Sequence, residues 1–192
     1  ASLIAVLHGS RERVTSCSTR DSSFALVANW DGKNVGRIDL RTGEVSFIPG
    51  FTRPAGVAIA PSGAYALVAN GSADNIGRIN LQIEAPVTFI EDKGFDFPLD
   101  VVISPRGDFA LVANAGKNNI ARLDLHNGDV SYIEDAGFKN PEGVAIASGF
   151  ALVANFTGGK LGRIDFPSGA VSFPYHGFNG ARDVAIAPDA SF

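Results

Sequence analysis

The sequence contains no methionine, one cysteine and one tryptophan among 192 residues. A single thiol, Cys17, excludes an internal disulfide framework and says little about the redox compartment. The missing methionine, with the start at Ala1, indicates that an initiator was removed or that the chain is a processed or truncated product. No signal peptide is visible, and no apolar run approaches the ~20 residues that span a membrane, so we expect no membrane insertion. The compartment stays unknown, with an extracytoplasmic or lumenal setting preferred.

Basic clusters and catalytic motifs are also lacking. The net charge of −4 is spread thinly, which speaks against a nucleic-acid partner. The three histidines, His8, His126 and His176, fall at unrelated positions of the repeat described below, so they do not predict a zinc site. There is no Gly-x-Ser-x-Gly elbow, phosphate-binding glycine loop or haem-attachment motif. The sequence therefore predicts no catalytic residue, no metal and no cofactor, and it leaves enzymatic activity uncertain, with a non-enzyme favoured.

A hexapeptide of the form (Phe/Tyr)-Ala-Leu-Val-Ala-Asn returns four times. Its copies are Phe24–Asn29, Tyr65–Asn70, Phe109–Asn114 and Phe150–Asn155. The closing asparagines are 41, 44 and 41 residues apart (29 to 70, 70 to 114, 114 to 155). A fixed period near 40 residues marks stacked supersecondary units.

Three further segments accompany each hexapeptide. An apolar segment precedes three of the hexapeptides, at 56–60, 100–104 and 143–147, and occurs again at 183–187; two more segments follow each hexapeptide, of the types Gly36–Leu40 and Val45–Ile48. All are short, rich in Val, Ile, Phe and Tyr, and bounded by Gly, Pro, Asn or Asp, which is typical of strands joined by turns. No segment has the 3.6-residue periodicity of a helix. The chain is predicted to be all-β.

The first two strands of each repeat are apolar on both faces, so both faces must be covered. Val57 and Ile59 share one face, and Ala58 and Ala60 share the other, as packing of sheets around an axis requires. This pattern and the period predict a β-propeller of four-stranded antiparallel blades. A single domain or propeller fragment is expected over 1–192, with complete blades at about 13–49, 56–91, 100–134 and 143–174. Partial-blade strands are expected at 3–7 and 183–192.

The partial strands raise the question of how the propeller closes. Open blade edges invite pairing with another chain. The chain is expected to be a fragment of a longer propeller, with two alternatives left open: closure as four or five irregular blades, or completion against a partner.

The blade resembles those of the NHL and YVTN propeller families. The shared order is apolar strand, Pro-x-Gly turn as in Pro61–Gly63, (F/Y)ALVAN, Asn-containing loop, GRIDL, x-x-Gly turn as in Arg41–Gly43, and VSFI. It departs from the WD type, since no Gly-His to Trp-Asp signature occurs. The resemblance covers almost the whole chain. It implies the fold and leaves function open, because these families bind proteins, RNA or small molecules and include enzymes.

Each third strand carries an arginine followed two residues later by an acid or amide. The arginines are Arg37, Arg78, Arg122 and Arg163, and the partners are Asp39, Asn80, Asp124 and Asp165. Spacing of two in a strand puts both side chains on one face. We expect a structural ladder that bridges neighbouring blades, with an anion-binding ring as the alternative. The asparagines that close the second strands are expected to cap loops.

Residues that break the repeat are better candidates for function, because the fold does not demand them. Trp30 and Phe156 occupy a loop position where the other repeats have Gly71 and Ala115. Large aromatic side chains on a loop are candidates for a partner surface. The predicted binding face combines these aromatics with charged residues of the loops that enter the first strands. Its six members are Trp30, Phe156, Arg53, Asp100, Arg182 and Asp183.

The leading functional hypothesis is a non-catalytic propeller that serves as a protein-interaction or scaffolding module within a larger assembly of subunits. The alternative is a propeller resembling metal-dependent lactone hydrolases, for which Asp100, Asp183 and the repeated asparagines would be the candidate ligands. A glycan or another small molecule bound in the central channel is a third possibility.

Overall fold

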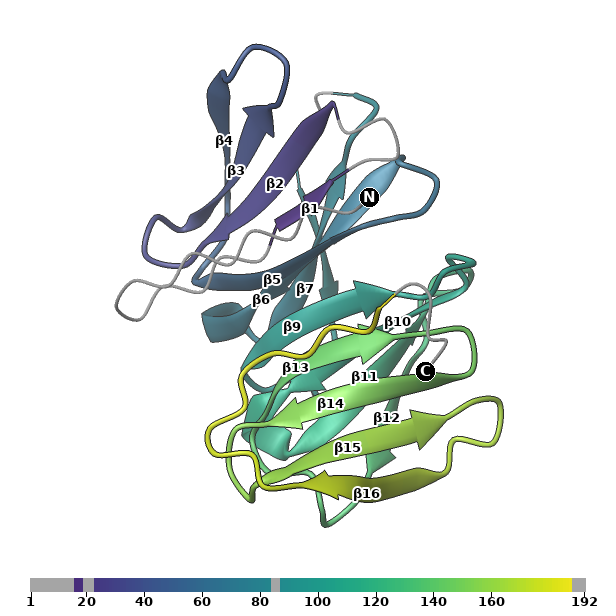
Figure 1. The fold of residues 1–192 in the computed structure, drawn as a ribbon. Coiled ribbons are helices and arrows are strands. Elements are labelled where there is room, and N and C mark those ends of the chain that lie inside the picture. The colour runs from purple at the N-terminus through teal and green to yellow at the C-terminus, as the bar shows by residue number, and fades with distance from the viewer. Residues whose placement is uncertain (1–15, 19–22, 84–86, 188–192) are drawn as a thin grey trace.

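The computed structural model describes residues 16–18, 23–83 and 87–187, which form four four-stranded antiparallel sheets (Figure 1). This confirms the predicted all-β propeller architecture. The described residues contain no α-helix, only two single 3₁₀ turns, and none of their helices is long and apolar enough to cross a membrane. The predicted strand at 3–7 lies outside the described residues.

Each blade runs from an inner strand to an outer strand in chain order. The first blade, A, consists of β1 (Ser16–Ser18), β2 (Phe24–Asn29), β3 (Asn34–Asp39) and β4 (Val45–Pro49). Blade B consists of β5 (Pro54–Ile59), β6 (Tyr65–Asn70), β7 (Asn75–Asn80) and β8 (Thr88–Glu91), with the 3₁₀ turn η1 (Gly71–Ala73). Blade C consists of β9 (Pro98–Ile103), β10 (Phe109–Asn114), β11 (Asn119–Asp124) and β12 (Val130–Glu134), with η2 (Ala115–Lys117). Blade D consists of β13 (Pro141–Ile146), β14 (Phe150–Asn155), β15 (Lys160–Asp165) and β16 (Val171–His176).

The inner strands lie next to one another, β1 beside β5, β5 beside β9 and β9 beside β13 (Figure 1). In blades B, C and D they begin at Pro54, Pro98 and Pro141, two residues earlier than predicted. A register shift follows each proline. Proline is tolerated as the first residue of a strand, where its missing N–H costs no ladder bond.

A phenylalanine in each inter-blade loop fastens one blade to the next, as predicted for Phe51, Phe95 and Phe138. These rings are at most 4% exposed. Each meets an outer-strand aromatic edge to face, with centroid distances of 6.0 Å for Phe51–Phe89, 6.4 Å for Phe95–Tyr132 and 5.4 Å for Phe138–Phe173. The fourth copy, Phe178, is 41% exposed, because no blade covers it in the described chain.

The strand predicted at the C-terminal end is not formed in its described part. Residues 181–187 have no strand assignment, and 188–192 lie outside the described residues. An inner strand takes its ladder bonds from the second strand of its own blade, as β13 does from β14. Among the described residues this segment has no such ladder partner, and it lies against Gly143 of β13.

In blades B, C and D, the asparagine that closes the second strand holds the loop that enters the same blade. The Oδ1 atoms of Asn70, Asn114 and Asn155 accept backbone N–H bonds of 2.6, 2.8 and 3.0 Å from that loop. In blade B the Asn70 amide also donates to Asn75 Oδ1 (2.9 Å), which in turn donates to Glu91 Oε1 (2.9 Å). The predicted capping role is confirmed.

Candidate functional site

Two sets of loops meet at one end of the blades, which we call the loop face. One set leaves the second strands at 30–33, 71–74, 115–118 and 156–159, and the other enters the inner strands at 50–53, 94–97, 137–140 and 177–182. Backbone bonds join the two sets, for example Gly71 N to Arg53 O at 3.1 Å and Phe156 N to Asn140 O at 3.0 Å. The loop face is therefore a continuous, hydrogen-bonded surface.

Trp30 lies at the centre of an aromatic cluster on the loop face. The Arg53 guanidinium carbon is 5.6 Å from its ring centroid, and the Phe97 ring meets it edge to face at 5.9 Å. The tryptophan ring rests against Gly71, where an added Cβ would come within 3.3 Å of Trp30 Cζ3. Buried Ala55, Leu99 and Ala115 belong to the same apolar cluster. The two aromatic rings are half-buried and Arg53 is exposed, so the cluster presents apolar area and a charge to solvent.

Arg53 and Phe97 occupy equivalent backbone positions with left-handed torsions, φ of 57° and 51°. Blade D and the segment that follows it have Asn140 and Gly180 at this position, with φ of 49° and 71°. Asparagine and glycine adopt this conformation readily, whereas larger side chains are strained in it. Because Asn140 and Gly180 are sufficient for this backbone conformation, the side chains of Arg53 and Phe97 have a role other than fixing the turn. Such strain is concentrated at functional sites.

A second arginine–aromatic pair lies at the far end of the loop face. The Arg182 guanidinium carbon is 4.6 Å from the Phe156 ring centroid, and Arg182 Nη1 is 3.3 Å from Glu142 Oε2. The Glu142 side chain is 7% exposed, while that of Arg182 is 62% exposed. Asn140 Nδ2 also donates to Glu142 Oε1 (3.3 Å). A buried carboxylate is compensated here by a cation and an amide.

Four of the six predicted face residues thus form two pairs, Trp30 with Arg53 and Phe156 with Arg182. Asp100 is not on the surface. It is buried, its Oδ1 accepts from Val101 N (2.9 Å) and its Oδ2 accepts from Val144 N of the neighbouring blade (2.9 Å). Asp183 is exposed and repeats the first of these bonds with Val184 N (2.8 Å).

The third-strand arginines lie over aromatic rings of their own blades, 4.1–4.5 Å from the centroids. Only Arg163 also bonds its acid, with Nη2 at 2.6 Å and Nε at 2.8 Å from Asp165 Oδ1, which raises the pKa of Arg163. Asp39 and Asp124 instead accept backbone N–H bonds from their turns, and these bonds hold the pKa of each carboxyl below its ordinary value. In the described chain, each of these arginines and acids therefore makes its contacts within its own blade. A ladder that bridges neighbouring blades was expected.

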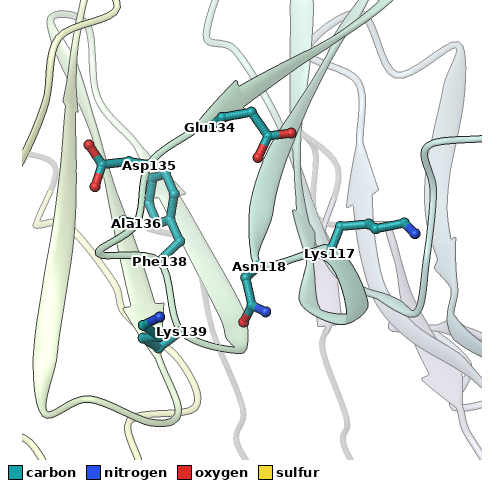
Figure 2. Close-up of a pocket in the computed structure, with 7 residues that line it drawn as sticks. All are labelled: Lys117, Asn118, Glu134, Asp135, Ala136, Phe138 and Lys139. Carbon is teal, nitrogen blue, oxygen red and sulfur yellow. The ribbon is translucent and has the colours of Figure 1, made fainter.

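A surface pocket of about 440 Å³ opens between blades C and D at the outer margin of the loop face (Figure 2). Its lining consists of Lys117, Asn118, Glu134, Asp135, Ala136, Phe138 and Lys139. Most of these polar groups already have partners. Lys117 Nζ is 3.7 Å from Asp96 Oδ2, Asn118 Oδ1 accepts from Asn140 N, and Glu134 Oε1 accepts from Asn119 Nδ2. In Figure 2 the Lys117 amine and the Asp135 carboxylate point to opposite sides, so they do not converge on a ligand.

Metal binding finds little support in the geometry. No group of three or more His, Cys, Asp or Glu side chains gathers within the described ranges. Both oxygens of Asp100 and the side-chain oxygens of Asn70, Asn114 and Asn155 already accept backbone hydrogens.

Two residues of the loop face were missed by sequence reasoning, Phe97 and Glu142. The sequence could have identified Phe97, because it precedes Pro98 at the position where another repeat has Asn140 before its proline. Glu142 had one as well, because Ala55 and Leu99 occupy its position in blades B and C.

Neither a protein-family model nor a curated protein matches the sequence. Solved structures match the fold. Kuenenia stuttgartiensis hydrazine synthase gives a TM-score of 0.74 at 23% identity over 89% of this chain and 53% of that chain. Virginiamycin B lyase from Staphylococcus aureus gives 0.73 at 18% identity over 92% and 60%, and a chain of a nidogen–laminin complex gives 0.76 at 15% identity over 86% and 65%. The chain therefore spans 53–65% of the length of these structures, and the likeness shows the β-propeller fold.

Proposed function

We propose that the chain is a non-catalytic protein-interaction module whose loop face contacts a partner through Trp30, Arg53 and Phe97. The observation that carries this proposal is the position of Arg53 and Phe97 at strained left-handed backbone positions, with both side chains directed at Trp30. Trp, Arg and other large aromatic side chains dominate the energetics of protein interfaces, because they bury much area at low entropic cost.

The second pair extends the same surface. Phe156 and Arg182 repeat the combination of a half-buried ring and an exposed guanidinium at the other end of the loop face. A partner that covers both pairs would span blades A to D. That a chain of a nidogen–laminin complex has this fold supports protein binding as a use of the architecture.

Membership of a larger assembly is part of the proposal. Large apolar side chains remain exposed at both ends of the blade series, Phe47 of blade A at 61% and Phe178 after blade D at 41%. Exposed aromatic area of this kind is typical of surfaces that other subunits cover.

The test compares two variants of the immobilised chain in capture from an extract of the source cells. The double variant W30A/F156A removes both loop-face rings, and L40A removes an exposed apolar side chain from the turn at the opposite end of blade A. We expect the double variant to lose a captured protein that the wild type and L40A retain, with the thermal melts of all three chains remaining cooperative. Equal recovery by all three would show that the loop face is not the contact surface.

A further inference from the structure

A second pocket, about 260 Å³, lies between blades B and C at the end of the blades opposite the loop face. It is bounded by the start of β6, the outer part of β7 and the turn that follows β11. Apolar side chains form part of the lining, among them Ile90 and Leu125. Two oppositely charged residues also line it, Arg78 from blade B and Asp124 from blade C.

Arg78 is held in place without an acidic partner in the described chain. Its guanidinium carbon lies 4.2 Å from the centroid of the Tyr65 ring. In the other three blades the residue two positions after this arginine is an aspartate, but in blade B it is Asn80. The Asn80 Oδ1 atom accepts turn bonds from Gln82 N (2.9 Å) and Ile83 N (3.3 Å). No described carboxylate lies within 4 Å of the Arg78 guanidinium.

Blade D shows what this arrangement can bind. Arg163 lies over the Phe150 ring as Arg78 lies over Tyr65, with a distance of 4.1 Å. Its edge atoms Nε and Nη2 both reach one carboxylate oxygen of Asp165, at 2.8 and 2.6 Å. An arginine held by its face on a ring keeps its in-plane N–H groups for a carboxylate. Arg78 offers the same groups to the pocket.

Asp124 supplies the opposite charge. Its Oδ1 atom accepts from His126 N (2.8 Å) and Asn127 N (3.2 Å), and these bonds lower the pKa of the carboxyl, so it is ionised at neutral pH. Both hydrogen bonds are accepted by the same carboxylate oxygen, Oδ1. No ion pair joins Asp124 to Arg78 in the part of the chain that the structure describes, so each charge is available to a ligand.

We propose that this pocket binds a small zwitterion with an apolar side chain, an amino acid or a close relative. The ligand carboxylate bonds Arg78, the ammonium group bonds Asp124, and the side chain lies against Ile90 and Leu125. The volume is below the ~300–1,000 Å³ of sites for drug-sized ligands, which favours a small molecule. This site is separate from the loop face and does not depend on the protein-interaction role.

The experiment is a calorimetric titration of the whole chain with L-leucine and two analogues that each lack one charge. L-Leucinamide keeps the ammonium group and loses the carboxylate, whereas 4-methylpentanoate keeps the carboxylate and loses the ammonium group. We expect saturable binding of leucine and at least tenfold weaker binding of each analogue, since each leaves one protein charge unpaired. No saturable leucine binding, or equal binding of 4-methylpentanoate, would overturn the proposal.

Three variants test the residues. R78Q removes the cation, N80D supplies the internal acid that blade D has, and D124N removes the anion; each should weaken leucine binding at least tenfold. Asn80 makes in blade B the turn bonds that Asp124 makes in blade C, so D124N should fold, as its thermal melt will show. R37Q, at the equivalent arginine of blade A, and W30A/F156A should bind leucine like the wild type. Unchanged affinity in R78Q would overturn the assignment.

Discussion

Truncation of Phe138 tests whether the inter-blade phenylalanines hold the propeller together. The ring is 1% exposed, meets Phe173 edge to face, and sits so close to Gly162 that a Cβ there would be 2.9 Å from Phe138 Cε1. Phe138→Ala therefore opens a cavity beside backbone that cannot move far into it. Such substitutions cost about 3–5 kcal/mol, and we expect about 4 kcal/mol, or a melting temperature lower by about 8–16 °C in a chain of this size.

Phe178→Ala is the matched control, because Phe178 occupies the same repeat position and is 41% exposed. It leaves no enclosed cavity, so we expect a loss of about 1 kcal/mol. Urea unfolding should be followed by circular dichroism and by fluorescence of Trp30, the one tryptophan, which reports on blade A. Coincident transitions will show that the blades unfold together. Equal destabilisation by the two substitutions would refute the role assigned to the buried ring.

Three other predictions follow from the packing. Gly56→Ala places a Cβ 2.7 Å from Asp100 Cα and should lower the free energy of unfolding in urea by about 1–3 kcal/mol. The control Gly36→Ala has no atom nearer than 3.8 Å to the added Cβ and should lower it by less than about 1 kcal/mol. A larger loss for Gly36→Ala than for Gly56→Ala would contradict the structure. The Tyr132 hydroxyl bonds Asp92 (2.5 Å) and lowers the pKa of that carboxyl, so this stabilisation is complete above pH ~4 and is lost as the pH falls through the folded-state pKa. Tyr132→Phe should therefore melt below the wild type at pH 7, with the gap narrowing at pH 3, and a gap that does not depend on pH would argue against this bond. Calcium or zinc should leave the melting temperature unchanged relative to matched salt, because both Asp100 oxygens already accept N–H bonds; a large rise would instead support the metal-dependent hydrolase.

The sequence predicted the fold because its repeat encodes each blade locally. Strand order, the capping asparagines and the inter-blade phenylalanines could all be assigned from pattern alone. The contacts of residues that deviate from the repeat could not be assigned, because periodicity does not say which neighbour such a side chain meets. Asp100 was expected on a binding face and is instead buried as a bridge between blades, and the strand expected at 183–187 has no ladder partner. Trp30 and Arg53 were identified as deviations from the repeat, but their contact with Phe97 depends on a left-handed backbone that sequence does not display directly.

From blade B onward, the first-strand positions of the repeat carry a pattern with twice the period of the sequence repeat. The equivalent residues are Gly56, Asp100, Gly143 and Asp183. Each glycine lies so close to the aspartate of the next unit that an added Cβ would be 2.7 Å from its Cα, and Asp100 then bonds the backbone after Gly143. Loss of blade C would bring Gly56 and Gly143 together and leave Val144 N without its carboxylate, whereas loss of blades C and D together would restore the alternation. Recombination within this gene is therefore expected to tolerate blades gained or lost in pairs.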